Sequence, residues 1–127
     1  DMHMSGSTSK YRFKNKAEID ILYENDMIEV KKLDRALPYQ SRWLVNSKVN
    51  KDLPDRRRVL LTNDKNERVM FISEYDALVD LLNHRVETGN NDNMDIIRDM
   101  ENASREKLEV YCLNMTKYLV ETTSKEG

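Results

Sequence analysis

The first predicted element is a strand over residues 10–14, where aromatic and basic side chains alternate. A period of two sends successive side chains to opposite faces, which is typical of a half-buried β-strand. Tyr11 and Phe13 share one face of this strand. The other face is basic and carries Lys10, Arg12 and Lys14.

The spacing of apolar residues then changes to that of a helix. Ile19, Leu22 and Tyr23 fall on one helical face, and Asn15 stands before them as a candidate N-cap. Ser, Thr, Asp and Asn are preferred at this position because their side chains accept a hydrogen bond from the first turn. The pattern predicts a short helix over residues 16–25.

An alternating segment follows this helix. Ile28 and Val30 alternate with Glu29 and Lys31, which predicts a second strand with one charged face. Such a strand buries its apolar face and leaves its charged face in solvent.

The next stretch has little periodicity. Residues 34–39 contain Pro38, and the residue before a proline avoids the helical region, so a turn is expected there. The apolar residues 43–45 predict a short strand. Residues 46–55 are polar, and we expect a loop.

The middle of the chain carries the clearest β signal. Two β-rich runs, residues 58–62 and 68–72, flank the short polar segment 63–67. Two such runs around a short turn predict a β-hairpin.

The last part of the chain predicts two helices. Ser73 is a suitable N-cap for a helix that Gly89 ends as the residue beyond the C-cap. A second helix is expected over residues 93–122, because apolar positions recur there at spacings of three and four. The short link between the helices favours an antiparallel pair. The stripe of the second helix comprises Ile97, Met100, Ser104, Leu108, Tyr111, Met115 and Tyr118.

These elements predict an α+β fold. A small, mainly antiparallel sheet that includes a central β-hairpin packs against a short N-terminal helix and a C-terminal antiparallel helix pair. The 127 residues suit a single domain, expected over residues 10–123. Residues 1–9 are interpreted as a cloning remnant followed by a flexible Ser- and Gly-containing start, and residues 124–127 as a flexible C-terminus.

Composition excludes several classes of protein. No apolar run approaches the roughly 20 residues of a membrane-spanning helix, so no membrane partner is expected. One cysteine excludes an intrachain disulfide framework and a multi-cysteine zinc site. The absence of a secretory pattern together with this free thiol favours a cytoplasmic protein.

Charge is distributed unevenly along the chain. Residues 1–58 contain 13 basic and 9 acidic residues, whereas residues 59–127 contain 8 basic and 14 acidic residues. The basic half could bind nucleic acid phosphates or an acidic protein, or be a solvated edge strand and loop. The acidic pI of 5.8 argues against a dedicated DNA-binding protein. The candidate nucleic-acid residues are Lys10, Arg12, Lys14, Arg56, Arg57 and Arg58.

No motif identifies a reaction. Asp80 and Glu87 lie one helical turn from His84, but a surface ion-pair face is commoner than a metal site. Cys112 has no histidine near it in the sequence, so a buried structural thiol is expected. Glycine-rich phosphate loops are absent. We therefore assign no catalytic residue, no metal ligand and no cofactor.

The expected last helix is apolar on more than one face and needs more cover than a small domain offers. The leading hypothesis is therefore a small non-catalytic binding or regulatory protein, an inhibitor of the kind that phages or mobile elements encode. It would bind a protein partner, and possible homodimerisation would use the same helices. The alternative is a nucleic-acid-binding regulator. The candidate protein-interaction residues are Ile96, Ile97, Met100, Leu113, Leu119, Val120 and Trp43.

Overall fold

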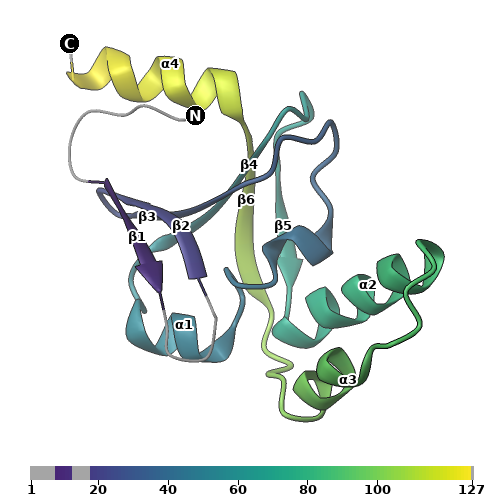
Figure 1. Cartoon of the computed structure of the whole chain (residues 1–127). Helices are drawn as coiled ribbons and strands as arrows, with labels where there is room; N and C mark the ends of the chain where they lie inside the picture. Colours follow the sequence, from purple (N-terminus) through teal and green to yellow (C-terminus); the bar gives the residue numbers. More distant parts are fainter. Residues whose placement is uncertain (1–7, 13–17, 127) are drawn as a thin grey trace.

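The computed structural model describes residues 8–12 and 18–126, and the side chains of residues 19–123 (Figure 1). Strands and helices alternate along the chain. In order they are β1 (Thr8–Arg12), β2 (Glu18–Tyr23), β3 (Asp26–Val30), the 3-10 helix η1 (Pro38–Ser41), α1 (Ser47–Asp52), β4 (Arg57–Thr62), β5 (Arg68–Ile72), α2 (Glu74–Glu87), α3 (Met94–Glu101), β6 (Leu108–Asn114) and α4 (Met115–Glu126).

The strands form one six-stranded sheet in the order β1-β2-β3-β4-β6-β5. β1, β2 and β3 make an antiparallel meander, and β5 pairs with β6 antiparallel. The central pairs β3–β4 and β4–β6 are parallel. The α+β class is confirmed, but the expectation of a mainly antiparallel sheet is wrong because two crossovers generate a mixed sheet.

The predicted central hairpin is also wrong in its pairing. Both runs are strands, but β6 lies between them. Tyr111 of β6 pairs with Val59 of β4 on one side and with Val69 of β5 on the other. Val59, Leu60 and Leu61 are fully buried, as in a strand covered on both faces and paired on both edges.

The predicted N-terminal helix over residues 16–25 is wrong, because residues 18–23 form β2. Leu22 pairs with Met27, and Glu24 adopts a φ of 50° in the tight turn to β3. Ile19 and Tyr23 fit a helical face and the alternation of a strand equally well, and pairing with β3 decides between them. Residues 10–12 of the predicted first strand lie in β1, which begins at Thr8, and residues 13–17 lie outside the described residues.

The crossover from β3 to β4 also differs from expectation. Residues 43–45 form a turn rather than a strand, and the predicted loop contains α1. Asn46 caps α1, since its Oδ1 accepts a hydrogen bond from Val49 N at 3.0 Å. Leu44, Val45 and Val49 are fully buried, so burial of the crossover against the sheet sets its conformation.

The helix α2 is confirmed, together with its capping. Ser73 Oγ accepts a hydrogen bond from Asp76 N at 3.0 Å, and Gly89 follows the C-cap with a φ of 89°. The predicted helix over 93–122 is wrong, because this segment comprises α3, β6 and the start of α4. It contains no glycine or proline to mark the breaks. The helix pair that the structure contains is α2 packed against α3.

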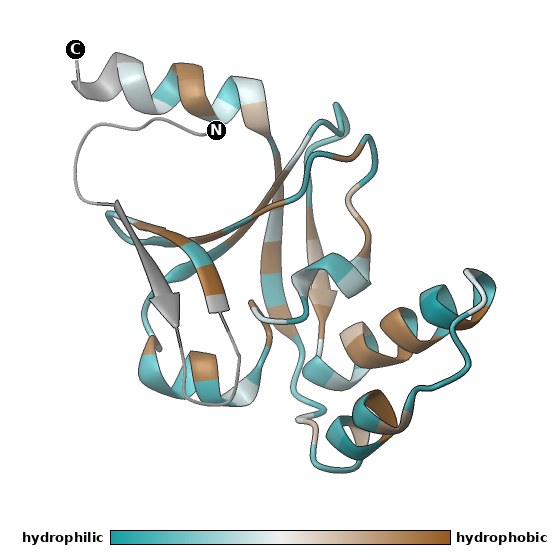
Figure 2. Cartoon of the chain, viewed as in Figure 1, coloured by the Kyte–Doolittle hydropathy of each residue, from teal (hydrophilic) through white to brown (hydrophobic). Residues whose placement is uncertain are grey.

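Both faces of the sheet are covered. The crossover face packs against η1, α1 and α2 through a core that includes Leu60, Val110 and Ala77. The α4 face packs against α4 through Val59 and Tyr118. In Figure 2 the hydrophobic segments follow the strands and α2 and α3, whereas the connecting loops are mostly hydrophilic. In the described chain no helix is both long and apolar enough to span a membrane.

The position of β6 gives a direct test of the fold. Cys112, at 2% exposure, is the chain's one cysteine, and burial raises its thiol pKa. We expect the folded protein to react with dithiobis(nitrobenzoate) only as fast as it opens, and to react completely in denaturant. A Cys112→Ala/Val120→Cys variant is the control, because Val120 is exposed on α4 and its replacement should label at once. Rapid labelling of native Cys112 would contradict the placement of β6.

Candidate functional site

Among the described residues, one buried charged side chain has an oxygen without a partner, and it lies in a central strand of the sheet. Glu29 of β3 is 6% exposed, and its Oε1 has no hydrogen-bond partner. An ionised carboxylate in such surroundings is costly unless it is paired or coordinates a cation. An unpaired oxygen at this depth therefore calls for a functional explanation.

A second carboxylate faces Glu29 from the neighbouring strand. Ile21 pairs with Ile28, so the next step of the same antiparallel register sets Asp20 opposite Glu29. The pairing gives way there, because Asp20 Oδ2 accepts a hydrogen bond from Val30 N at 3.1 Å. Directly opposed side chains have Cβ atoms about 5 Å apart, and like charges at that separation destabilise a sheet. We call Asp20 and Glu29 the acid pair.

The electrostatics of the acid pair are those of two groups that cannot both ionise freely. Burial, and then the charge of Asp20, raise the pKa of Glu29 from 4.5 to about 7. Lys31 acts in the opposite direction, with its Nζ 3.3 Å from Glu29 Oε2. The site can thus hold a proton or a cation between its two acids.

A hollow of about 190 Å³ opens above Glu29, and we call it the acid-pair hollow, although of the two acids only Glu29 lines it. Three cationic side chains line it, namely those of Lys31, Arg42 and Arg85. Gln40 also lines it and is 4% exposed. The Oε1 of Gln40 accepts a hydrogen bond from Leu37 N at 3.0 Å, while its Nε2 has no acceptor. The hollow therefore combines an unpartnered acceptor, an unpartnered donor and three cationic side chains, each of which is paired with a carboxylate.

The crossover after β3 positions this lining. Pro38 begins η1, and the backbone N of Tyr39 donates to Asp80 of α2 at 2.9 Å. The ring of Tyr39 stacks on His84 with centroids 4.3 Å apart. These contacts fix η1 against α2, in front of the sheet in Figure 1. Gln40 is held over the end of β3 as a consequence.

The two arginines that line the hollow are held by acids on α3. Arg42 pairs with Asp99 at 2.7 Å, and its guanidinium lies 4.4 Å from the centre of the Trp43 ring. Arg85 pairs with Asp95 at 3.1 Å. Both acids are exposed, so both arginines remain at the surface where an anionic ligand can reach them.

Nothing in the described part of the chain gathers three or more His, Cys, Asp or Glu side chains into a metal-binding group. Mg²⁺ does not require such a group. It is commonly bound by one or two carboxylates, with water and substrate phosphate as the other ligands. Asp20 and Glu29 supply two carboxylates of the kind that this ion prefers.

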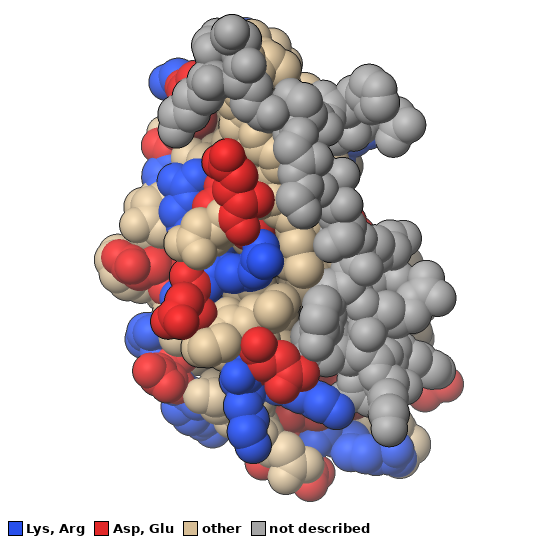
Figure 3. All heavy atoms as spheres, turned by 90° about the vertical axis from the view of Figure 1, so that its left-hand side faces the viewer, with Lys and Arg blue, Asp and Glu red and all other residues tan. Residues whose placement is uncertain are grey.

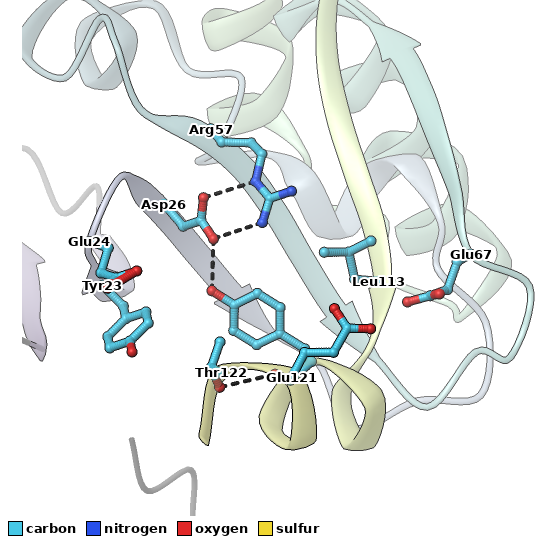
Figure 4. A pocket seen from close by; sticks show the side chains of 9 residues that line it. Tyr23, Glu24, Asp26, Arg57, Glu67, Leu113, Glu121 and Thr122 are labelled. Carbon is cyan, nitrogen blue, oxygen red and sulfur yellow. Dashed lines mark hydrogen bonds and ion pairs between the residues drawn. The ribbon is translucent and has the colours of Figure 1, made fainter. Parts of the chain in front are cut away.

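A different hollow, on the α4 face, contains a second acid of β3, Asp26, whose carboxylate is satisfied (Figure 4). Arg57 donates to both carboxylate oxygens of Asp26 at 2.9 Å, and the Tyr118 hydroxyl donates to the same carboxylate at 2.7 Å. Burial and the hydrogen bond to Asp26 raise the pKa of Tyr118. This network joins α4 to β3 and β4, which is a structural role.

The structure does not join the candidate nucleic-acid residues into one surface. Lys10 and Arg12 lie in β1, where the backbone alone is described, and Lys14 lies outside the described residues. Arg56 donates to the backbone oxygens of Glu24 and Asp26. Arg57 belongs to the α4 face, whereas Arg58 donates to Asn50 of α1 on the crossover face. Where Figure 3 shows the described side chains, basic and acidic residues are interspersed.

The candidate protein-interaction residues are likewise spread over several elements. Ile96 is buried, while Ile97 of the same helix is half exposed, with Met100 one turn further on. Trp43 and Leu113 pack against the core of opposite faces of the sheet. Leu119 and Val120 lie on α4, where Val120 is exposed.

The acid pair was missed in the sequence for a definable reason. Glu29 and Lys31 alternate with apolar residues, and that alternation indicates a solvent-facing side. Asp20 fell inside a segment assigned to a helix. The signal that could have found the site is a carboxylate on each of two neighbouring strands, followed by a lysine two residues after the second carboxylate.

Comparisons with protein-family models, with curated proteins and with solved structures return no match. The candidate site therefore rests on its own geometry.

The raised pKa of Glu29 gives a stability test. The folded state holds this proton up to about pH 7, whereas the unfolded chain loses it near pH 4.5. Stability therefore falls as the pH rises through that window, by about 3 kcal/mol at roughly 1.4 kcal/mol per pKa unit. Glu29→Gln should remove this loss, so that the variant is more stable than the wild type at pH 8 in urea unfolding.

The matched control is Glu101→Gln, which removes a carboxylate from an exposed position on α3. Its unfolding free energy should follow the wild-type pH profile within about 0.5 kcal/mol. A Glu29→Gln variant that is destabilised at pH 8 would show that the Glu29 carboxylate is satisfied in the folded protein.

Proposed function

We propose that this protein is a divalent-cation-dependent phosphodiesterase acting on nucleic acid. The observation that carries the proposal is the acid pair, whose Glu29 has an unpartnered buried oxygen at the base of a hollow lined by three cations. Paired carboxylates attract a divalent cation, and the surrounding positive charges attract the anionic substrate on which such a cation acts.

A bound cation would explain why the fold keeps two repelling carboxylates next to each other. Bound between Asp20 and Glu29, Mg²⁺ or Mn²⁺ would relieve their repulsion, polarise a phosphoryl oxygen and lower the pKa of a bound water. The protein supplies the two carboxylates on rigid, hydrogen-bonded strands, so little reorganisation accompanies binding.

The lining of the hollow selects for phosphate. A pair of carboxylates also serves in glycoside hydrolysis, where one acid protonates the leaving group of a neutral sugar. Here Lys31, Arg42 and Arg85 line the hollow, which favours a phosphodiester over an uncharged substrate. Guanidinium groups bind phosphate oxygens through two parallel donors. Gln40 Nε2 offers one more donor beside them.

Lys31 is the residue placed to act on the reacting groups. Its ammonium lies 3.3 Å from the same carboxylate that would hold the cation. At this position it orients the attacking water and stabilises the negative charge that develops on the phosphoryl oxygens. The reaction is hydrolysis: the oxygen of water bonds to phosphorus, the P–O ester bond breaks, and the leaving oxygen takes a proton.

The protein-binding role expected from the sequence stays a prediction. Its premise, a continuous apolar helix over residues 93–122, is absent from the structure. The nucleic-acid-binding regulator expected as the alternative also stays a prediction, and the phosphodiesterase proposed here uses residues that were not among its candidates.

Activity and cation binding test the proposal together. We expect the wild type to hydrolyse bis(p-nitrophenyl) phosphate and a labelled oligonucleotide with Mg²⁺ or Mn²⁺ and to lose activity in EDTA. Asp20→Asn, Glu29→Gln and Lys31→Met should each lower kcat by at least 100-fold, the scale of losing one transition-state interaction. Asp20→Asn and Glu29→Gln should also abolish Mn²⁺ binding in calorimetry.

The unfolding data separate this result from misfolding, since Glu29→Gln is expected to be the more stable protein. Glu101→Gln should retain activity and Mn²⁺ binding. Absence of cation binding by the wild type, or unchanged Mn²⁺ affinity in Glu29→Gln, would contradict the proposal.

A further inference from the structure

A second hollow adjoins the first one. It has a volume of about 400 Å³ and shares Arg42 and Trp43 with the acid-pair hollow. Its other lining residues come from α1, α2 and α3, and we call it the Trp43 hollow. Because the two hollows have a common wall, one extended ligand can occupy both.

The charge of the Trp43 hollow is positive once its internal pairs are counted. Lys48 and Arg98 line it, and both are exposed and make no hydrogen bond or ion pair with other described residues. Its two acids are already engaged. Asp99 pairs with Arg42, and the buried Glu74 accepts hydrogen bonds from Ser47 Oγ at 2.8 Å and Ser104 N at 3.0 Å.

Trp43 adds an aromatic surface between these cations. Its ring packs partly against the core and carries the Arg42 guanidinium on one face at 4.4 Å. Grooves that hold single-stranded nucleic acid combine cations along the backbone with aromatic side chains on which bases stack. A run of cations alone would serve an acidic peptide equally well, but the aromatic surface favours bases.

We infer that the Trp43 hollow binds the nucleotides of a single-stranded nucleic acid next to the scissile phosphodiester. Lys48 and Arg98 contact successive backbone phosphates, and a base stacks on the Arg42 guanidinium that Trp43 carries, where Arg42 bridges the two hollows. The inference rests on the proposed function, because it extends a strand whose phosphodiester lies in the acid-pair hollow.

Binding without turnover tests the groove. Fluorescence anisotropy with a labelled 12-nucleotide single strand is measured in EDTA, from 50 to 200 mM salt. Lys48→Glu/Arg98→Glu should weaken binding at least tenfold at low salt and reduce the slope of log affinity against log salt by about 1.4, or 0.7 per phosphate contact. Trp43→Ala should weaken binding about fivefold or more, and Trp43→Phe should restore most of the loss.

The control is Lys51→Glu/Lys65→Glu, which makes the same change of charge at exposed positions that line neither hollow. It should bind within twofold of the wild type. Equal weakening in the control and the Lys48→Glu/Arg98→Glu variant would overturn the inference, since binding would then follow net charge. Stronger binding of a duplex than of the single strand would also overturn it.

Failure of the inference and failure of the proposed function are distinguishable. Wild-type hydrolysis of bis(p-nitrophenyl) phosphate reports the acid pair alone, because this small substrate has no strand to fill the Trp43 hollow. Hydrolysis by the wild type with unaltered binding by the Trp43-hollow variants overturns the inference and leaves the function standing. Loss of binding in those variants without any wild-type hydrolysis supports the groove and refutes the phosphodiesterase.

Discussion

The opposition of two carboxylates across the first two buried strands is the constraint on which the rest of the site depends. Asp20 and Glu29 face each other where β2 and β3 stop pairing, and Val30 N has exchanged a strand partner for the Asp20 side chain. An apolar residue at position 29 would cost the sheet nothing. The surrounding structure instead brings a lysine, two arginines and an amide donor to the same place. Each of these groups can complement a negative or metal-bound ligand, and under the proposed function the binding of that ligand would offset the cost at Glu29.

The same strand contains a second acid, and its carboxylate is held by hydrogen bonds within the protein. Asp26, at the other end of β3, accepts two hydrogen bonds from Arg57 and one from Tyr118. These hydrogen bonds join α4 to the sheet and engage both oxygens of the Asp26 carboxylate. Glu29 has a single cationic partner, Lys31, on one oxygen and none on the other. Asp26 is partly buried and Glu29 is buried, and the two carboxylates differ mainly in how many hydrogen bonds they accept.

The sequence predicted correctly those elements whose structure is decided by interactions between residues close in the sequence. The caps at Ser73 and Gly89 act within one turn, so α2 was placed correctly. β4 and β5 were found from their composition, but the strand that pairs with both is β6, whose Tyr111 lies 52 positions after its partner Val59 and 42 positions after its partner Val69. The apolar spacing over residues 93–122 fits a helix. Only the pairing of β6 with β4 and β5 makes Val110 and Cys112 the inward face of a strand. The acid pair was missed for the same reason. The alternation of Glu29 with Ile28 predicts a solvent-facing carboxylate only where no other element covers the Glu29 face of the strand. In this fold η1 covers that face.

Under the proposed function, protonation of Glu29, binding of the cation and stability of the fold are linked, because all three depend on the Glu29 carboxylate. Near pH 7 Glu29 gains or loses a proton with little cost, so a cation at the acid pair competes with that proton over the pH range in which the enzyme would work. Above this range the folded domain without a cation holds a charge that burial opposes, and a bound cation stabilises the folded state by mass action. Such a site would bind the cation most tightly at the pH values at which the empty acid pair destabilises the fold most. Affinity for the cation and the stability cost of the empty pair would therefore both reflect the burial of Glu29 and, after it, the repulsion between Asp20 and Glu29.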